Sequence, residues 1–228
     1  EISGEFATGG LIHRILIGAD HDEFDNLQDF RRVRPPSVAS NPTDEEAYVI
    51  DILDPVYGRF PLPTPLPQNN RLDQQSSTGF FVQDQIELTD RLQVRLGARY
   101  DDFKLRTENY LTDVDSERND SRVSPQFGVV YEVSPAVTFY AAYSEGFRAN
   151  IGTDVTGRIF DPEVSKSVEA GAKLTLLNGA LIGTFTLYQL EKDNVLASDI
   201  NNPGFSVAIG EARSRGVELD VNGRLPGD

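Results

Sequence analysis

Residues 92–101 read LQVRLGARYD, and apolar and polar residues alternate strictly along this stretch. The apolar residues share one parity and are Leu92, Val94, Leu96, Ala98 and Tyr100. Successive side chains of a β-strand point to opposite faces, so the alternation predicts a strand with one apolar and one polar face. Because the surrounding segment 91–109 lacks a pair of turn residues, the predicted strand is much longer than the usual length of about five or six residues.

The same alternation recurs further along the chain. It is present in VSPQFGVVYEV (123–133), SVEAGAKLTL (167–176) and GVELDVNGRL (216–225). No stretch shows comparable patterning at the 3.6-residue period of a helix. The sequence therefore predicts an all-β chain of about nine antiparallel strands.

The connections between these strands alternate in length. Short turns are expected at TDR (89–91), SPA (134–136) and LNGA (177–180), where the Asn-Gly pair suits a tight hairpin. Long connections are expected at about 25–77, 110–121, 149–165 and 199–206. This pattern predicts up-and-down strands with short turns at one end and long loops at the other.

Composition narrows the classes of protein that fit. The chain of 228 residues carries 36 Asp and Glu against 21 Lys and Arg, and this acidic excess argues against nucleic acid as a partner. It has no Cys, which excludes disulfides and cysteine-ligated metals. It has no Met either, and we expect a mature chain or an internal fragment of a longer protein. No apolar run approaches the roughly 18 to 20 residues that a membrane helix needs.

Two architectures explain repeated alternating strands: a soluble β-sandwich and an outer-membrane β-barrel. Three features favour the barrel, namely long strands, turns that alternate between short and long, and aromatic residues at consistent heights. Tyr100 and Tyr143 stand about eight residues above their short turns, whereas Tyr131 lies three residues from one. These are the levels at which two interfacial girdles of aromatic residues are expected.

The stretch YAAYSEGFRAN (140–150) fits a strand that crosses lipid, interface and water in succession. One residue breaks the pattern elsewhere. In GFFVQDQIEL (79–88), Asp84 falls on the parity that would face lipid, where a carboxylate is costly. Either a bulge shifts the register there or the strand is misread.

Four blocks, in this order and spacing, resemble the barrel of TonB-dependent outer-membrane receptors, and most closely the ferric-siderophore subgroup. The blocks are GFFVQDQIELTDRLQVRLGARYDDF (79–103), YAAYSEGFRAN (140–150), FDPEVSKSVEAGAK (160–173) and GEARSRGVELDVNGRLPG (210–227). The resemblance implies a 22-stranded barrel in the bacterial outer membrane, with long extracellular loops and short periplasmic turns. It also implies an N-terminal plug and uptake driven by TonB. We expect residues 1–228 to be part of such a barrel, without the plug domain and the remaining strands.

The resemblance implies a ferric siderophore as ligand, with an Fe(III) chelate as cargo and no cofactor of the protein itself. The expected partners are the siderophore, outer-membrane lipid, lipopolysaccharide, and TonB through the plug. Bulky chelates are held by cations and aromatic faces. The candidate ligand-binding residues are Arg31, Arg32, Arg34, Tyr140, Arg148, Phe160 and Phe205.

Structural alternatives stand beside these assignments. The arginine cluster can pair with Asp25, Asp29 and the acidic run 44–46, or with lipopolysaccharide phosphates, and the loop aromatics can simply pack the loops together. Tyr140 and Arg148 are expected to point into the lumen near the outer mouth. No catalytic motif is found, and His13 and His21 are expected to be solvated or interfacial, so we expect a protein that is not an enzyme.

Three functions stay open at this stage. The first is import of ferric siderophores. The second is import of another cargo, such as cobalamin or an oligosaccharide, or passive diffusion through a porin-like barrel. The third is a soluble all-β binding module.

Overall fold

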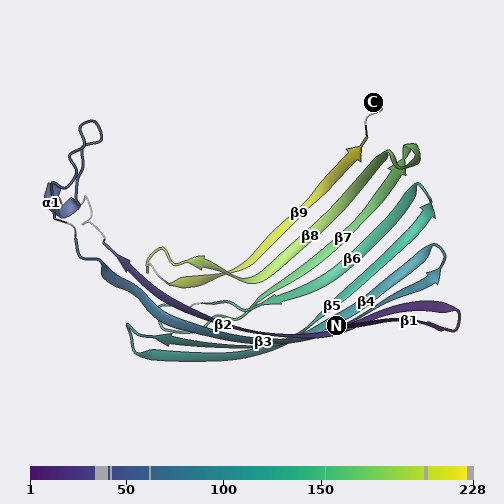
Figure 1. Ribbon diagram of the computed structural model, residues 1–228, viewed down its shortest axis with the longest axis horizontal. Helices are drawn as coiled ribbons and strands as arrows, with labels where there is room; N and C mark the ends of the chain where they lie inside the picture. The colour runs from purple at the N-terminus through teal and green to yellow at the C-terminus, as the bar shows by residue number, and fades with distance from the viewer. Residues whose placement is uncertain (34–40, 42, 62, 152, 203–204, 225–228) are drawn as a thin grey trace.

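The computed structural model describes residues 1–33, 41, 43–61, 63–151, 153–202 and 205–224. Within them, nine strands form one antiparallel sheet in which each strand pairs with its neighbours in the sequence. The strands are β1 Ile2–Thr8, β2 Leu11–Arg32, β3 Leu66–Thr89, β4 Leu92–Asn109, β5 Val114–Ser134, β6 Val137–Arg148, β7 Glu163–Leu176, β8 Leu181–Ser198 and β9 Ser206–Gly223. Figure 1 shows that the sheet is strongly curved, like part of a cylinder wall. The prediction of about nine up-and-down strands is confirmed.

The turns alternate in length as expected, with the short turns gathered at one end of the sheet and the longer connections at the other (Figure 1). Gly9 and Gly10 join β1 to β2, and their φ angles of 59° and 90° are those that a tight hairpin requires. The 3-10 turn η2 (Leu177–Gly179) joins β7 to β8, and α1 (Asp44–Ala47) lies in the connection between β2 and β3. In the described part of the chain, no helix is long and apolar enough to cross a bilayer.

Two of the predicted long connections are shorter than expected because the strands continue. The strands β4 and β5 pair as far as Asn109 and Val114, so the predicted loop 110–121 shrinks to residues 110–113. Likewise β2 extends to Arg32 and β3 begins at Leu66, inside the predicted loop 25–77. These extensions are mostly polar on both faces, so the alternation that marks a membrane strand is missing from them.

The sheet has two distinct faces. On the face that we call convex, large apolar side chains are exposed, for example Phe80 at 54%, Tyr131 at 46% and Phe127 at 50%. On the opposite, concave face, long side chains lie across glycines of the neighbouring strands, as Arg99 does at Gly79 and Tyr140 at Gly171. An apolar surface of this kind is typical of the lipid-facing side of a membrane barrel.

The apolar pattern changes sides along β4. Up to Tyr100 the apolar residues lie on the convex face, but beyond it Phe103 and Leu105 lie on the concave face and are buried at 8% and 1% exposure. They form a small core with Ile159 of the loop between β6 and β7, against which Phe147 and Ala149 pack. The reversal marks the height at which the wall leaves lipid and its inner face becomes the side that excludes water.

The strands β5 and β6 separate at the same end of the sheet. Their pairing stops at Gln126 and Ser144, although β5 continues its pairing with β4 to Val114. The next residue of β5 is Pro125, which has no N–H to donate to a ladder. The final residues of β6 are therefore free to leave β5 and pack across the concave face.

We predict that a cation is tolerated on only one face of β5. Val129 and Val130 are adjacent, of the same type and similarly exposed at 38% and 41%, but they point to opposite faces. Val129→Arg places a charge in lipid and should cost about 2–4 kcal/mol of folding free energy, whereas Val130→Arg should cost much less. Unfolding titrations of the full-length protein in lipid vesicles measure both, and equal costs would contradict the assignment of the faces. Leu96 is a poorer test because it lies directly opposite Asp84, which could neutralise a new cation.

Candidate functional site: the concave face

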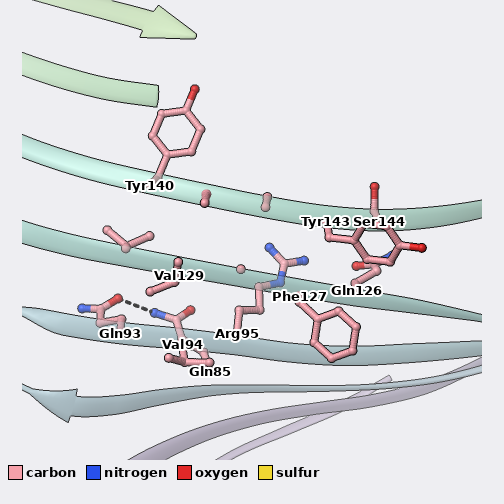
Figure 2. Close-up of a pocket in the computed structure, with 14 residues that line it drawn as sticks. Gln85, Gln93, Val94, Arg95, Gln126, Phe127, Val129, Tyr140, Tyr143 and Ser144 are labelled. Atoms are coloured by element: carbon pink, nitrogen blue, oxygen red, sulfur yellow. Dashed lines mark hydrogen bonds between the residues drawn. The ribbon is translucent and has the colours of Figure 1, made fainter. Parts of the chain in front are cut away.

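At the height of the bilayer, the concave face is polar and holds a cavity of about 340 Å³ over β3 to β6. Figure 2 shows Arg95 of β4 and Tyr140 of β6 projecting from the same side of the sheet. The Gln85 side chain donates a hydrogen bond of 3.0 Å to Gln93 beside them. Water-facing groups of this kind line the lumen of membrane barrels.

Tyr140 is held in place by its neighbours. Its hydroxyl lies 2.7 Å from the Thr186 hydroxyl of β8, two strands away. The ring crosses Gly171 of β7, where a β-carbon would lie 2.7 Å from the ring carbons. Glycine at this position therefore permits the ring to lie flat on the wall, and the hydroxyl is engaged within the barrel wall itself.

A denser ionic cluster lies higher on the same face. The Arg99 guanidinium donates to both carboxylate oxygens of Asp20 at 2.8 Å and to Asp101 at 2.7 Å. To reach Asp20 on β2, the side chain crosses β3 at Gly79, where a β-carbon would lie 1.9 Å from Nη2. The bidentate geometry and the second carboxylate hold this cation rigidly.

The end of β6 encloses a second cavity, of about 650 Å³, against this cluster. Glu145 accepts a hydrogen bond of 2.6 Å from Arg122 of β5, and Phe147 packs on the buried core. Ser124 lines the cavity at 4% exposure, and its hydroxyl oxygen has no protein partner. A buried hydroxyl without a partner costs free energy unless water or a ligand satisfies it.

The loop between β6 and β7 is tied down over the concave face. Its Gly157 carbonyl accepts from Ser116 at 3.1 Å, and Asp161 accepts from Arg118 at 2.8 Å. Asn150, which is buried, donates to the carbonyls of Asp161 and Asn194 at 2.7 Å each. These bonds join β5, the loop and β8, and they hold the loop inward instead of leaving it extended in solvent.

Two carboxylates organise the loops internally. The Thr156 hydroxyl and nearby backbone N–H groups hold the pKa of Asp154 below its ordinary value. The Asn202 side chain and backbone N–H groups likewise lower the pKa of Asp199. Hydrogen bonds to the ionised form cause both shifts, so both carboxylates are charged at neutral pH.

A third cavity, of about 770 Å³, lies where the far ends of β2 and β3 meet the loop between β8 and β9. Phe30, Arg32 and Ile200 are among its lining residues. Arg31 donates to Asp29 at 3.2 Å near the end of β2, so the expected alternative of pairing with Asp29 holds for that residue. Arg34 lies outside the described residues.

The structure separates the residues expected to act together. Tyr140 is the fourth residue of β6, near the short-turn end, whereas Arg148 is the last. The eight-residue interval corresponds to about 26 Å along a strand. The expectation that both stand near the outer mouth is therefore wrong for Tyr140, although Arg148 does line the upper cavity. Phe160 and Phe205 are half-buried in the two loops.

Asp84 keeps its predicted parity, and neither explanation offered for it holds. Its pairing with Ile15 and Leu96 is regular. The register shifts lie elsewhere, between Phe30 and Arg31 where β2 pairs with β3, and between Glu87 and Thr89 where β3 pairs with β4. Instead, Asp84 accepts a hydrogen bond of 2.7 Å from His13 of β2, which lies diagonally opposite on the same convex face. Sequence reasoning missed this contact because 71 residues separate the two.

Within the part of the chain that the structure describes, no group of three or more His, Asp or Glu side chains could hold a metal ion. What the concave face offers is a set of cavities lined by paired charges, amides and aromatic rings. Such a surface can bind and release a polar ligand.

Comparisons with known proteins agree with this geometry. A family model described as TonB dependent receptor-like, beta-barrel matches residues 3–226. The metal-pseudopaline receptor CntO of Pseudomonas aeruginosa is 35% identical over 232 residues, which cover 99% of this chain and 31% of that protein. The ferrichrome outer membrane transporter/phage receptor of Escherichia coli is 31% identical over 229 residues, 99% of this chain and 29% of that protein.

Solved structures show the same fold. The alcaligin outer membrane receptor FauA of Bordetella pertussis matches with a TM-score of 0.63 and 24% identity, over 98% of this chain and 35% of that one. The ferric-catecholate import receptor Fiu of E. coli matches with a TM-score of 0.72 and 16% identity, over 98% and 34%. This chain thus spans about a third of the length of the proteins it matches.

We predict that Gly79 is required for the ionic cluster. Gly79→Ala places a methyl group where the Arg99 guanidinium lies, so the end of this side chain must move away and lose Asp20; because both partners are partly exposed, we expect a cost of about 1 kcal/mol or less. Gly128→Ala is the matched control, because Gly128 also lies on the concave face and its β-carbon would meet only ordinary contact at 3.7 Å. Thermal unfolding of both variants of the full-length protein in detergent tests this, and equal stability of the two would refute the role of Gly79.

Proposed function

Because this chain belongs to the TonB-dependent receptor β-barrel family, we propose that it forms part of the wall of an outer-membrane importer of ferric siderophores. The family places the chain in the outer membrane. The proposal of a siderophore cargo is supported by relatives such as the ferrichrome transporter of E. coli and the ferrioxamine B receptor of Salmonella typhimurium, at 31% and 27% identity.

The observation that carries the proposal is the upper concave cavity. It combines the Arg99 cluster, the buried Ser124 hydroxyl, the ring of Phe147 and the terminal Arg148 of β6. An iron chelate is a bulky ligand with polar oxygens around an organic shell, and such a mixed lining suits it. The inward-packed loop between β6 and β7 closes one side of the cavity.

The role of the wall is binding and passage, without chemistry on the cargo. Most cations of the described concave face already have carboxylate partners, as Arg99, Arg118 and Arg122 show. These pairs keep the wall rigid and polar, so a ligand can be released as well as captured. In the complete receptor, a plug coupled to TonB would drive the release.

A second candidate cargo is a chelate of another metal. This candidate is favoured by the 35% identity to a metal-pseudopaline receptor, because the name of that receptor refers to a metal in general. Competition between iron-loaded and other metal-loaded chelates for uptake separates the two candidates.

We predict that Arg148 contributes to capture and that Tyr140 does not. Removing a cation from such a pocket costs about 0.5–2 kcal/mol, so Arg148→Ala should weaken binding by up to about thirtyfold. Tyr140→Phe should leave capture unchanged, because the hydroxyl it removes is engaged by Thr186 far from the upper cavity. Host cells that express the full-length receptor and make no siderophore are incubated with ⁵⁵Fe-labelled ferrichrome, ferrioxamine B and pyoverdine.

Surface abundance of each variant is measured by antibody labelling as a control. Loss of capture in Tyr140→Phe with full capture in Arg148→Ala would contradict the placement of the site. Failure of the unaltered receptor to capture any of the three chelates would exclude these three as cargo, and the competition between metal-loaded chelates would then decide between iron and another metal.

A further inference from the structure

Three polar side chains form a hydrogen-bonded chain on the convex face, next to the hairpin between β1 and β2. The ring nitrogen Nδ1 of His13 lies 2.7 Å from Oδ2 of Asp84, and Nε2 lies 2.8 Å from the hydroxyl of Thr8. A carboxylate can only accept, so Nδ1 carries the hydrogen and Nε2 is left to accept the Thr8 hydroxyl proton.

The surroundings hold this chain in one geometry. The Phe6 ring stacks on the His13 ring with centroids 4.9 Å apart and planes 2° from parallel. The side chains of His13 and Asp84 are 14% and 25% exposed, whereas Thr8 is exposed at the end of its strand. The hydroxyl is thus the accessible end of a chain whose other members are fixed.

The location argues for a function. Ionisable residues on the lipid-facing side of a membrane protein are costly and rare, and they commonly mark functional sites. A single exposed apolar residue at either position would have avoided the cost. A hydrogen bond to Asp84 explains His13 but does not explain the hydroxyl placed on the second nitrogen.

The arrangement has the parts of an acyl-transfer site: a hydroxyl, an imidazole within hydrogen-bond reach of it, and a carboxylate that orients the imidazole. The two residues after Thr8 are Gly9 and Gly10, which lie beyond the last pair of the ladder, Thr8 and Leu11. The N–H of Gly9 follows Thr8 directly in the chain, and the N–H of the residue after a nucleophile commonly stabilises an oxyanion.

We propose that Thr8, His13 and Asp84 form a hydrolytic site for carboxylic esters of glycerophospholipids in the periplasmic leaflet. Thr8 adjoins a short turn, and short turns lie at the periplasmic end of such barrels. The ester bonds of a phospholipid lie just beneath its headgroup, at the level of this hairpin. The activity is separate from import and does not depend on which cargo the receptor carries.

The steps balance without a further reactant besides water. The Thr8 oxygen attacks the ester carbonyl carbon while His13 Nε2 takes the hydroxyl proton. The bond to the glycerol oxygen breaks, and that oxygen takes the proton from His13, which leaves a lysophospholipid and an acyl ester on Thr8. Water then attacks the acyl ester with His13 as base, releasing a fatty acid and restoring the hydroxyl. Asp84 acts through His13 and is a positioning residue.

The test uses the full-length receptor in vesicles of phosphatidylethanolamine with isotopically labelled acyl chains, and mass spectrometry measures free fatty acid. We expect release above that from protein-free vesicles, reduced at least about a hundredfold by Thr8→Val and by His13→Ala, as loss of a nucleophile or general base does. Thr8→Ser should retain activity. Brief reaction followed by proteolysis should yield an acylated peptide containing Thr8.

Asp84→Asn should lower the rate and also change its pH profile, because the amide no longer holds the tautomer of His13. A purely structural role of Asp84 would not change that profile. His21→Ala is the control: His21 also contacts a hydroxyl, Thr78 at 2.8 Å, and a carboxylate, Glu23 at 3.5 Å, but its side chain is 54% exposed and it lies away from the short-turn hairpin. Capture of the siderophore by each variant reports that the barrel is intact.

Absence of release above the protein-free vesicles would overturn the proposal. Release that persists in Thr8→Val, or that falls equally in His21→Ala, would overturn it as well. In either case the three residues would serve only to give a carboxylate in the wall a hydrogen-bond partner. Loss of hydrolysis leaves import untouched, so failure here is distinguishable from failure of the proposed import function.

Discussion

Inside a bilayer, each backbone N–H and C=O must find a partner within the protein, and this constraint shapes the whole chain. Lipid offers no hydrogen bonds, so strands can cross it only as members of a continuous ladder. The sheet obeys this from β1 to β9 along its membrane-spanning length. Where water returns, the constraint is lifted, and there the ladder between β5 and β6 stops beside Pro125. The upper cavity exists because a strand is allowed to leave the wall at that height.

The concave face satisfies a second requirement, that charged groups taken from water have partners. Arg99 reaches two carboxylates, and it can do so because Gly79 leaves its path open. Tyr140 reaches Thr186 over Gly171 in the same manner. In both cases a glycine on the intervening strand leaves room for a long side chain to reach a partner two strands away. The resulting contacts hold polar groups rigidly on the inner surface of the wall.

The convex face, in contrast, is largely apolar. Asp84 is an exception, and it has a polar partner on the same face. Asp84 is compensated by His13, and the contact joins β2 and β3 across the lipid-facing surface. The reversal at Tyr100, beyond which Phe103 and Leu105 turn inward, shows where lipid ends. Above that height the apolar residues that must avoid water are found inside the wall and are covered by the loop between β6 and β7.

The sequence by itself determined the strands, their order and the face that each presents to lipid. It could do so because a membrane strand imposes a period of two over many residues, as in residues 92–101. It placed the end of β4 near residue 109 but not the start of β5, because residues 114–120 are mostly polar on both faces and show no alternation of apolar and polar residues. Contacts between residues distant in the chain, such as Arg99 with Asp20 and His13 with Asp84, follow from the register between strands and were decided only by the tertiary structure. The same holds for the heights of Tyr140 and Arg148, since parity gives the direction of a side chain but not its distance from the mouth.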